Sequence, residues 1–104
     1  MARFDVYLNP DKSEQALIPF YLDVQSDYIK GLQTRIVVPL WRAGELVSGV
    51  EQLNPSFEVA GQSVVMDTPS LGAIPISVLA KKVDSLAAEQ LQIQNALDAI
   101  FGSY

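Results

Sequence analysis

The chain of 104 residues contains neither cysteine nor histidine, and these two absences exclude much chemistry. Without cysteine there is no disulfide framework and no thiolate metal site. Without histidine the chain lacks the commonest general base and the commonest metal-binding imidazole. A nucleophile would have to be Ser, Thr or Lys, and none lies in a nucleophile-elbow sequence. We therefore expect a protein that is not an enzyme and that uses no cofactor and no metal.

Basic residues are also few, because seven Lys and Arg stand against twelve Asp and Glu, giving a net charge of −5. Non-specific nucleic-acid surfaces need clustered Lys and Arg, so direct binding to DNA or RNA is not expected. The sequence has no apolar run approaching the roughly 20 residues of a membrane span, and no signal-peptide pattern at its start. We expect a soluble, cytoplasmic protein with one domain over residues 1–104.

What the sequence does contain is a series of β-strand patterns. Residues 3–8 and residues 20–25 each alternate apolar and polar side chains, which is typical of half-buried strands. The polar, turn-rich residues 9–14 predict an exposed loop. The two strands are therefore expected to form an antiparallel pair joined by a long loop.

Three further segments favour strands. Residues 36–38 are apolar without alternation, as in a strand covered on both faces, and Pro39 is expected at the end of that strand. Residues 57–66 predict a hairpin that turns around Gly61. Residues 76–79 predict the last strand.

A helical period replaces the alternation near the end of the chain. From Val83 onward the apolar residues fall close to one helical face, which predicts a helix over residues 85–101. Asp84 or Ser85 is the expected N-cap, and Gly102 is the expected C-terminal stop. Strands followed by one terminal helix predict a mainly β fold, a small antiparallel sheet with a single helix packed across it.

Four charged residues are candidates for a site. Asp23 and Asp27 are interpreted as solvated acids at a strand end, in an ordinary turn whose Ser and Asp side chains cap their own backbone. Arg35 and Arg42 are isolated arginines and are interpreted as surface charges. The residues alone thus predict no catalytic site.

Two aromatic features stay open to more than one interpretation. Trp41 lies beside a strand, where core or edge packing is expected more often than a binding role. Phe101 and Tyr104 follow the predicted helix, and either they fold back onto the sheet or they form a tail that is held in an interface.

Four sequence blocks together resemble the CcdB family, the toxins of CcdA–CcdB toxin–antitoxin modules. They span nearly the whole chain, in the family's order: Phe4-Asp5-Val6-Tyr7, Leu22-Asp23-Val24-Gln25-Ser26-Asp27, Arg35-Ile36-Val37-Val38-Pro39-Leu40, and Ile74-Pro75-Ile76-Ser77-Val78 leading to Asn95-Ala96-Leu97. The resemblance implies an SH3-like antiparallel β-barrel with a C-terminal helix, and a homodimer in which the two helices lie side by side. It also implies a toxin that binds the A subunit of DNA gyrase and traps its cleaved-DNA complex without enzymatic activity.

The resemblance further implies two binding surfaces. The gyrase-binding residues would be Gln25, Ser26, Asp27, Tyr28, Asn95, Asp98, Phe101, Gly102, Ser103 and Tyr104. A small CcdA-like antitoxin, whose disordered part folds on binding, would contact Asn9, Pro10, Asp11, Lys12, Ser13 and Glu14. Operator DNA would be reached only through the antitoxin.

One position departs from the family pattern. The gyrase poisons of the family carry Trp directly after the terminal Phe, whereas Gly102 follows Phe101 here. Two alternatives therefore stay beside the gyrase toxin. One is a non-toxic relative that binds the antitoxin but not gyrase, and the other is an RNA endonuclease toxin of related fold.

Overall fold

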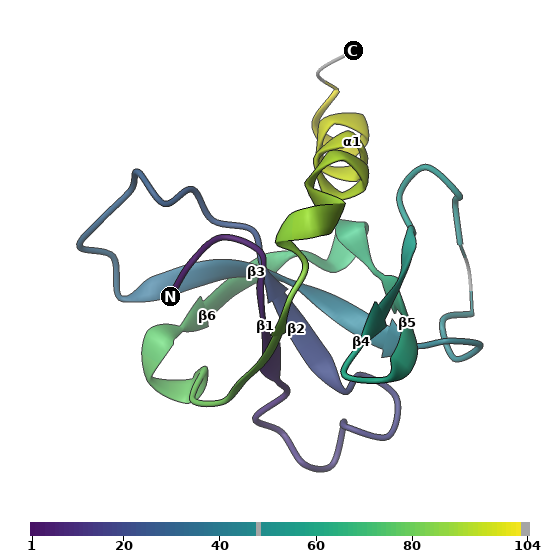
Figure 1. The fold of residues 1–104 in the computed structure, drawn as a ribbon, viewed down its shortest axis with the longest axis horizontal. Coiled ribbons are helices and arrows are strands. Elements are labelled where there is room, and N and C mark those ends of the chain that lie inside the picture. The colour runs from purple at the N-terminus through teal and green to yellow at the C-terminus, as the bar shows by residue number, and fades with distance from the viewer. Residues whose placement is uncertain (48, 103–104) are drawn as a thin grey trace.

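The computed structural model describes residues 1–47 and 49–102, and an antiparallel sheet forms most of it (Figure 1). The strands are β1 (Asp5–Leu8), β2 (Phe20–Asp23), β3 (Thr34–Arg42), β4 (Ser56–Val59), β5 (Gln62–Met66), β6 (Gly72–Pro75) and β7 (Lys82–Ser85). The helices are the short 3₁₀ turns η1 (Thr68–Ser70), η2 (Ile76–Val78) and η3 (Ala87–Glu89), and the α-helix α1 (Gln90–Phe101).

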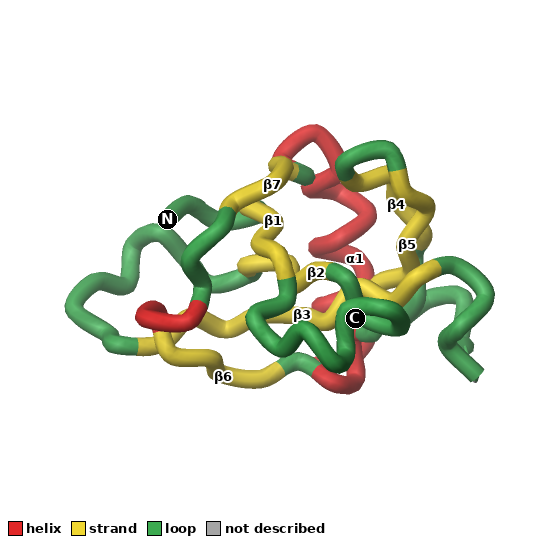
Figure 2. The backbone as a smooth tube through the Cα atoms, turned by 90° about the horizontal axis from the view of Figure 1, so that it is seen from below, coloured by secondary structure: helices red, strands yellow, loops and turns green. Residues whose placement is uncertain are grey.

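The strands run in the order β4-β5-β3-β2-β1-β7, and β6 pairs with the first half of β3. The sheet curls into a half-barrel, with α1 standing at one end of it (Figures 1 and 2). The Asp84 carboxylate of β7 accepts a hydrogen bond from the Ala60 amide of the β4–β5 turn at 2.9 Å, so the two outer strands meet. The fold class expected from the sequence, an SH3-like antiparallel barrel with a C-terminal helix, is confirmed.

The barrel interior holds the main hydrophobic core. Val6, Leu22 and Leu40 from the central strands are fully buried, and Ile93 of α1 is buried against the same cluster. Burial of such side chains is the main free energy that holds a helix to a sheet. The helix is therefore anchored by its inner face.

The expectation that β1 is half-buried is wrong. Tyr7 lies on the side of β1 away from the main core, yet only 4 % of it is exposed, because it packs with Val37 and Leu79 in a second apolar cluster. Burial raises the pKa of Tyr7 to about 12, with the nearby charge of Asp5 adding to the effect. The β6–β7 connection covers a face that the alternating sequence pattern predicts to be exposed.

Pro39 lies inside β3, not at the end of a strand as expected. β6 pairs with β3 up to Val37, and β5 takes over from Leu40. The Pro39 carbonyl accepts the Asp67 amide at 2.9 Å. In an antiparallel strand, the N–H and C=O of one residue point to the same side. The N–H that Pro39 lacks would therefore point to the place where β6 ends and β5 begins as the partner of β3. The proline therefore costs the sheet little.

The hairpin predicted around Gly61 is confirmed. Val59 of β4 pairs with Gln62 of β5, leaving a two-residue turn of Ala60 and Gly61, whose φ angles are 48° and 80°. Positive φ at both turn positions matches the right-handed twist of the strands, and glycine adopts it without strain.

The predicted last strand at residues 76–79 is wrong. Ile76–Val78 forms the 3₁₀ turn η2, in which Ile76 and Val78 are partly exposed, and only Leu79 is buried. The last strand is β7, which pairs with β1 across a register shift between Val6 and Tyr7. A short apolar run does not by itself distinguish a strand from a helical turn.

The predicted helix start at residue 85 is also wrong, whereas its end is confirmed. Val83 belongs to β7, and the Leu86 amide donates to the Phe4 carbonyl at 2.8 Å, which holds this segment against β1. The α-helix begins only at Gln90, after η3. Gly102 has φ 73° and its amide donates to the Asp98 carbonyl, as expected of a glycine stop.

Asp84 offers a test of how the outer strands are joined. Its carboxylate accepts the backbone amides of Ala60 at 2.9 Å and Ser85 at 2.7 Å, and these bonds lower its pKa below the ordinary value of 3.8. We expect Asp84→Ala to lower the free energy of unfolding at pH 7 by about 1–2 kcal/mol, measured by urea titration.

A lowered folded-state pKa means that the carboxylate stabilises the protein above its ordinary pKa and that this contribution is lost as the pH falls further. The difference between wild type and Asp84→Ala should therefore shrink between pH 7 and pH 3. An equal loss at both pH values would contradict this assignment. Glu51→Ala, at an exposed acid in the β3–β4 loop, is the control and should change stability by less than about 0.5 kcal/mol.

Candidate functional site

The segment after β2 begins with a buried ion pair. Arg35 Nε of β3 lies 2.7 Å from Asp23 Oδ2, and the Asp23 side chain is fully buried while only 9 % of the Arg35 side chain is exposed. Burial is the largest influence on Asp23 and raises the pKa of its carboxyl, against the opposing hydrogen bond from Arg35. The expectation that Asp23 and Arg35 are solvated is therefore wrong: each charge has its partner on the neighbouring strand.

The ion pair continues into the following turn. Arg35 Nη2 donates to the Gln25 carbonyl at 3.4 Å and lies 3.6 Å from Asp27 Oδ1, which leaves the Asp27 side chain 56 % exposed. The Gln25 amide donates to Asp23 Oδ1 at 3.0 Å, and Gln25 Oε1 accepts the Ile36 amide at 3.1 Å. Gln25 is thus buried and acts as part of the frame, whereas Asp27 reaches the surface, in accord with the interpretation of that residue.

The turn presents Tyr28 to solvent. Ser26 Oγ accepts the Tyr28 amide at 3.2 Å, and the Ser26 carbonyl accepts the Ile29 amide at 3.3 Å, which confirms the predicted capping role of Ser26. Tyr28 is 96 % exposed. The ring is therefore accessible to a partner, and aromatic side chains are enriched among the residues that contribute most to protein interfaces.

The outer face of α1 supplies the second part of the predicted site. Asp98 is half-buried, whereas Asn95, Phe101 and Gly102 are exposed, Phe101 to 68 %. The helical spacing of Asp98 and Phe101 puts them on neighbouring turns of one side. The predicted positions Ser103 and Tyr104 lie outside the described residues.

A groove of about 390 Å³ joins the two parts. Its wall includes Gln25 and Ser26 from the turn and Asp98 and Phe101 from α1, with apolar side chains such as Leu97 at its base. Four of the residues predicted for gyrase binding therefore face one hollow, although about 70 positions separate the two segments. Arg3 also lines the groove, and sequence reasoning missed it because a lone arginine near the start of a chain carries no signal.

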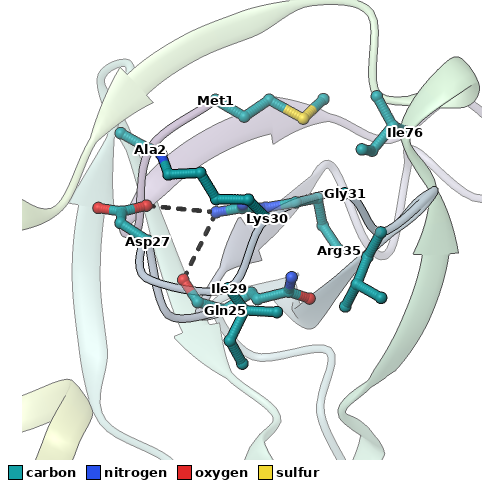
Figure 3. Close-up of a pocket in the computed structure, with 10 residues that line it drawn as sticks. Met1, Ala2, Gln25, Asp27, Ile29, Lys30, Gly31, Arg35 and Ile76 are labelled. Carbon is teal, nitrogen blue, oxygen red and sulfur yellow. Dashed lines mark hydrogen bonds and ion pairs between the residues drawn. The ribbon is translucent and has the colours of Figure 1, made fainter.

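A second pocket, of about 400 Å³, lies on another side of the same turn. Met1 and Ile76 border it on one side and Ile29 on the other, with Arg35 bonded to Asp27 and Gln25 in its wall (Figure 3). Arg35 of the ion pair lines this pocket, and Gln25, which is bonded to both Asp23 and Arg35, lines this pocket and the groove.

The loop predicted to bind the antitoxin lies at the opposite end of the barrel from α1 (Figure 1). Asn9 is buried, because its Nδ2 donates to the Ile18 carbonyl at 2.8 Å and its Oδ1 accepts the Asp11 amide at 2.9 Å. The expectation of an exposed loop is wrong for Asn9 and confirmed for residues 10–14. Asp11 Oδ1 accepts hydrogen bonds from the amide and the hydroxyl of Ser13, and these bonds hold the start of the loop. The same bonds lower the pKa of Asp11.

Trp41 lies within β3 opposite Val65 of β5, and not beside a strand as expected, but its packing role agrees with the expectation. Its Nε1 donates to Asp67 Oδ2 at 3.0 Å, which satisfies the indole in a half-buried position. Among the described residues, no group of three or more His, Cys, Asp or Glu side chains could hold a metal ion. Within the same residues, no helix is both long and apolar enough to span a bilayer.

Comparison with protein families gives one finding. The family model described as CcdB protein matches residues 3–102, which is nearly the whole chain and includes both parts of the groove.

The buried ion pair generates a stability prediction. Asp23→Leu or Arg35→Met alone leaves the other group buried without its main partner, and each should lower the free energy of unfolding by about 3–5 kcal/mol. The double variant replaces both by apolar side chains and should lose less than either single variant.

Urea titration, monitored by circular dichroism, measures the free energy of unfolding of all three variants. Arg42→Met is the control, because Arg42 is exposed and donates to the Ala16 carbonyl away from the pair. Additive losses in the double variant would show that the two side chains act independently and would contradict the assignment.

Proposed function

The chain belongs to the CcdB family of toxins from toxin–antitoxin modules, and from this premise we propose that it poisons DNA gyrase. In this proposal a single domain over residues 1–104 binds the gyrase A subunit and traps the cleaved-DNA complex. The action is protein contact without enzymatic turnover, and its target puts it in the cytoplasm. A CcdA-like antitoxin neutralises the toxin.

The groove between the β2–β3 segment and α1 carries this proposal. The residues that the family resemblance assigns to gyrase contact come from two distant segments, and Gln25, Ser26, Asp98 and Phe101 line one hollow. Two segments that are distant in the sequence can bind one partner only if the fold brings them together. The β2–β3 segment and α1 meet in this way at the groove.

Exposed aromatic side chains support the same surface. Tyr28 is 96 % exposed and Phe101 is 68 % exposed, and they stand on the two segments that form the groove. Aromatic side chains contribute most strongly to protein interfaces when a partner removes them from water. With Gly102 in the family's Trp position, these two rings are the aromatic contacts of the proposed surface within the described residues, and Tyr104, the third aromatic of the predicted set, lies outside them.

The proposed assembly is a homodimer with the two α1 helices side by side. The exposed apolar side chains of α1 outside the groove, Leu91 at 75 % and Ile100 at 36 %, support a partner for the helix. Two copies would bring two grooves to one end of the dimer.

The proposed antitoxin contact is the loop with Pro10, Asp11, Lys12, Ser13 and Glu14, supported at its base by the buried Asn9. Its distance from α1 leaves room for different partners at the two ends of the barrel (Figure 1). Operator DNA is bound only through the antitoxin, in line with the net charge of −5.

Linearisation of supercoiled plasmid by purified gyrase and ATP tests the function. Wild-type protein should produce linear DNA after protease and detergent treatment. Phe101→Ala and Tyr28→Ala should each raise the required concentration about thirtyfold, which corresponds to 2 kcal/mol, because each removes an interface aromatic. Val47→Ala is the matched control, since Val47 is fully exposed in the β3–β4 loop away from the groove.

Absence of linear DNA at every concentration, together with normal growth on expression, would overturn gyrase poisoning. Antitoxin binding in the same preparation would then select the non-toxic alternative, which Gly102 in the Trp position favours. Degraded RNA after incubation with the purified protein would select the endonuclease.

A further inference from the structure

Arg3 contacts both segments of the groove with one side chain. It lies just before β1 and is half-buried. Its Nε donates to the Val24 carbonyl at 3.1 Å, at the start of the β2–β3 segment, and its Nη2 donates to Gln94 Oε1 at 3.0 Å on α1. The guanidinium therefore bridges the turn and the helix.

The bridge continues to predicted site residues at both ends. The Arg3 amide donates to Asp27 Oδ1 at 2.9 Å, and Gln94 Nε2 donates to Asp98 Oδ1 at 2.9 Å. Because Gln94 accepts through its oxygen and donates through its nitrogen, its amide has one orientation in this chain of contacts. Asp27, Arg3, Gln94 and Asp98 thus form a connected series from the turn to the helix.

The position of the Arg3 side chain is itself fixed. Its guanidinium carbon lies 4.7 Å from the centre of the Phe4 ring, within the range of a cation–π contact, and Phe4 is part of the buried core. A guanidinium has a rigid planar fork of donors, so it can serve two acceptors in different directions, which the single ammonium of a lysine does less well. The Phe4 ring, the Val24 carbonyl and Gln94 Oε1 together restrict the Arg3 side chain to one position.

We propose that Arg3 is a positioning residue that holds the β2–β3 segment and α1 in one arrangement. The inference rests on the proposed function, because it gives gyrase a preorganised surface in which residues 25–28 and 98–101 keep a fixed relation. A surface ordered in advance loses less conformational freedom on binding and so binds more tightly.

Hydrogen–deuterium exchange of the full chain tests the bridge without gyrase. Arg3→Met keeps the backbone bond to Asp27 but removes the bonds to Val24 and Gln94. Amide exchange in residues 24–31 should become about tenfold faster, whereas the β3–β5 core should be unchanged. Arg42→Met is the matched control, because Arg42 Nε also donates to a backbone carbonyl, that of Ala16 at 2.8 Å, at the other end of the barrel. It should leave exchange in residues 24–31 as it is in wild type.

A double-variant cycle tests the bridge in gyrase binding. Arg3→Met and Gln94→Met should each weaken the affinity for the gyrase A subunit about tenfold under conditions in which urea titration shows both variants to be fully folded. The double variant should lose clearly less than the sum of the two single losses, because both changes break the bond between Arg3 and Gln94, while each also removes one bond of its own, to Val24 or to Asp98. Arg3→Lys should restore only part of the loss, since one ammonium replaces the fork.

The outcomes separate this inference from the proposed function. Unchanged exchange in Arg3→Met, or additive losses of affinity in the double variant, would overturn the positioning role while gyrase binding by wild type still stands. If wild type does not bind gyrase, the proposed function fails, and faster exchange confined to residues 24–31 still supports the bridge.

Discussion

The ion pair between Asp23 and Arg35 is the constraint on which the rest of the site depends. Two charges taken out of water are costly, and their attraction offsets that cost only when the geometry is close and the remaining polar atoms are bonded. Here the Nε–Oδ2 distance is 2.7 Å, and Asp23 Oδ1 accepts the Gln25 amide. The pair therefore fixes the direction in which the chain leaves β2, and with it the turn that presents Tyr28.

The groove follows from two anchors of different kinds. The core holds α1 through Ile93, Ala96 and Leu97, which leaves the other side of the helix for contact. The ion pair holds the turn, and Arg3 joins turn and helix across the hollow. The apolar core determines where α1 lies on the sheet, but it does not determine the position of the polar β2–β3 turn relative to α1. Directional hydrogen bonds determine that position.

The sequence predicts those parts of the fold whose signals are local. Gly61 marks the hairpin and Gly102 the helix end, because both need a positive φ that glycine adopts readily. The sequence pattern predicts a strand over residues 76–79 and a helical Val83, and both predictions are wrong, because a short apolar run fits a strand, a turn or a helix until its neighbours are known. The ion pair between Asp23 and Arg35 joins two strands, and no local sequence pattern predicts such a long-range contact. Both residues lie in the sequence blocks that resemble the CcdB family, but that resemblance does not indicate that they pair. Arg3 was missed for the same reason.

The central claim is that one partner contacts the turn and the helix together. Its most direct test is hydrogen–deuterium exchange of the wild-type chain with and without the purified gyrase A subunit. The account predicts simultaneous protection of residues 24–29 and 94–101, with residues 10–14 unchanged. Protection confined to residues 10–14, or to only one side of the groove, would contradict it.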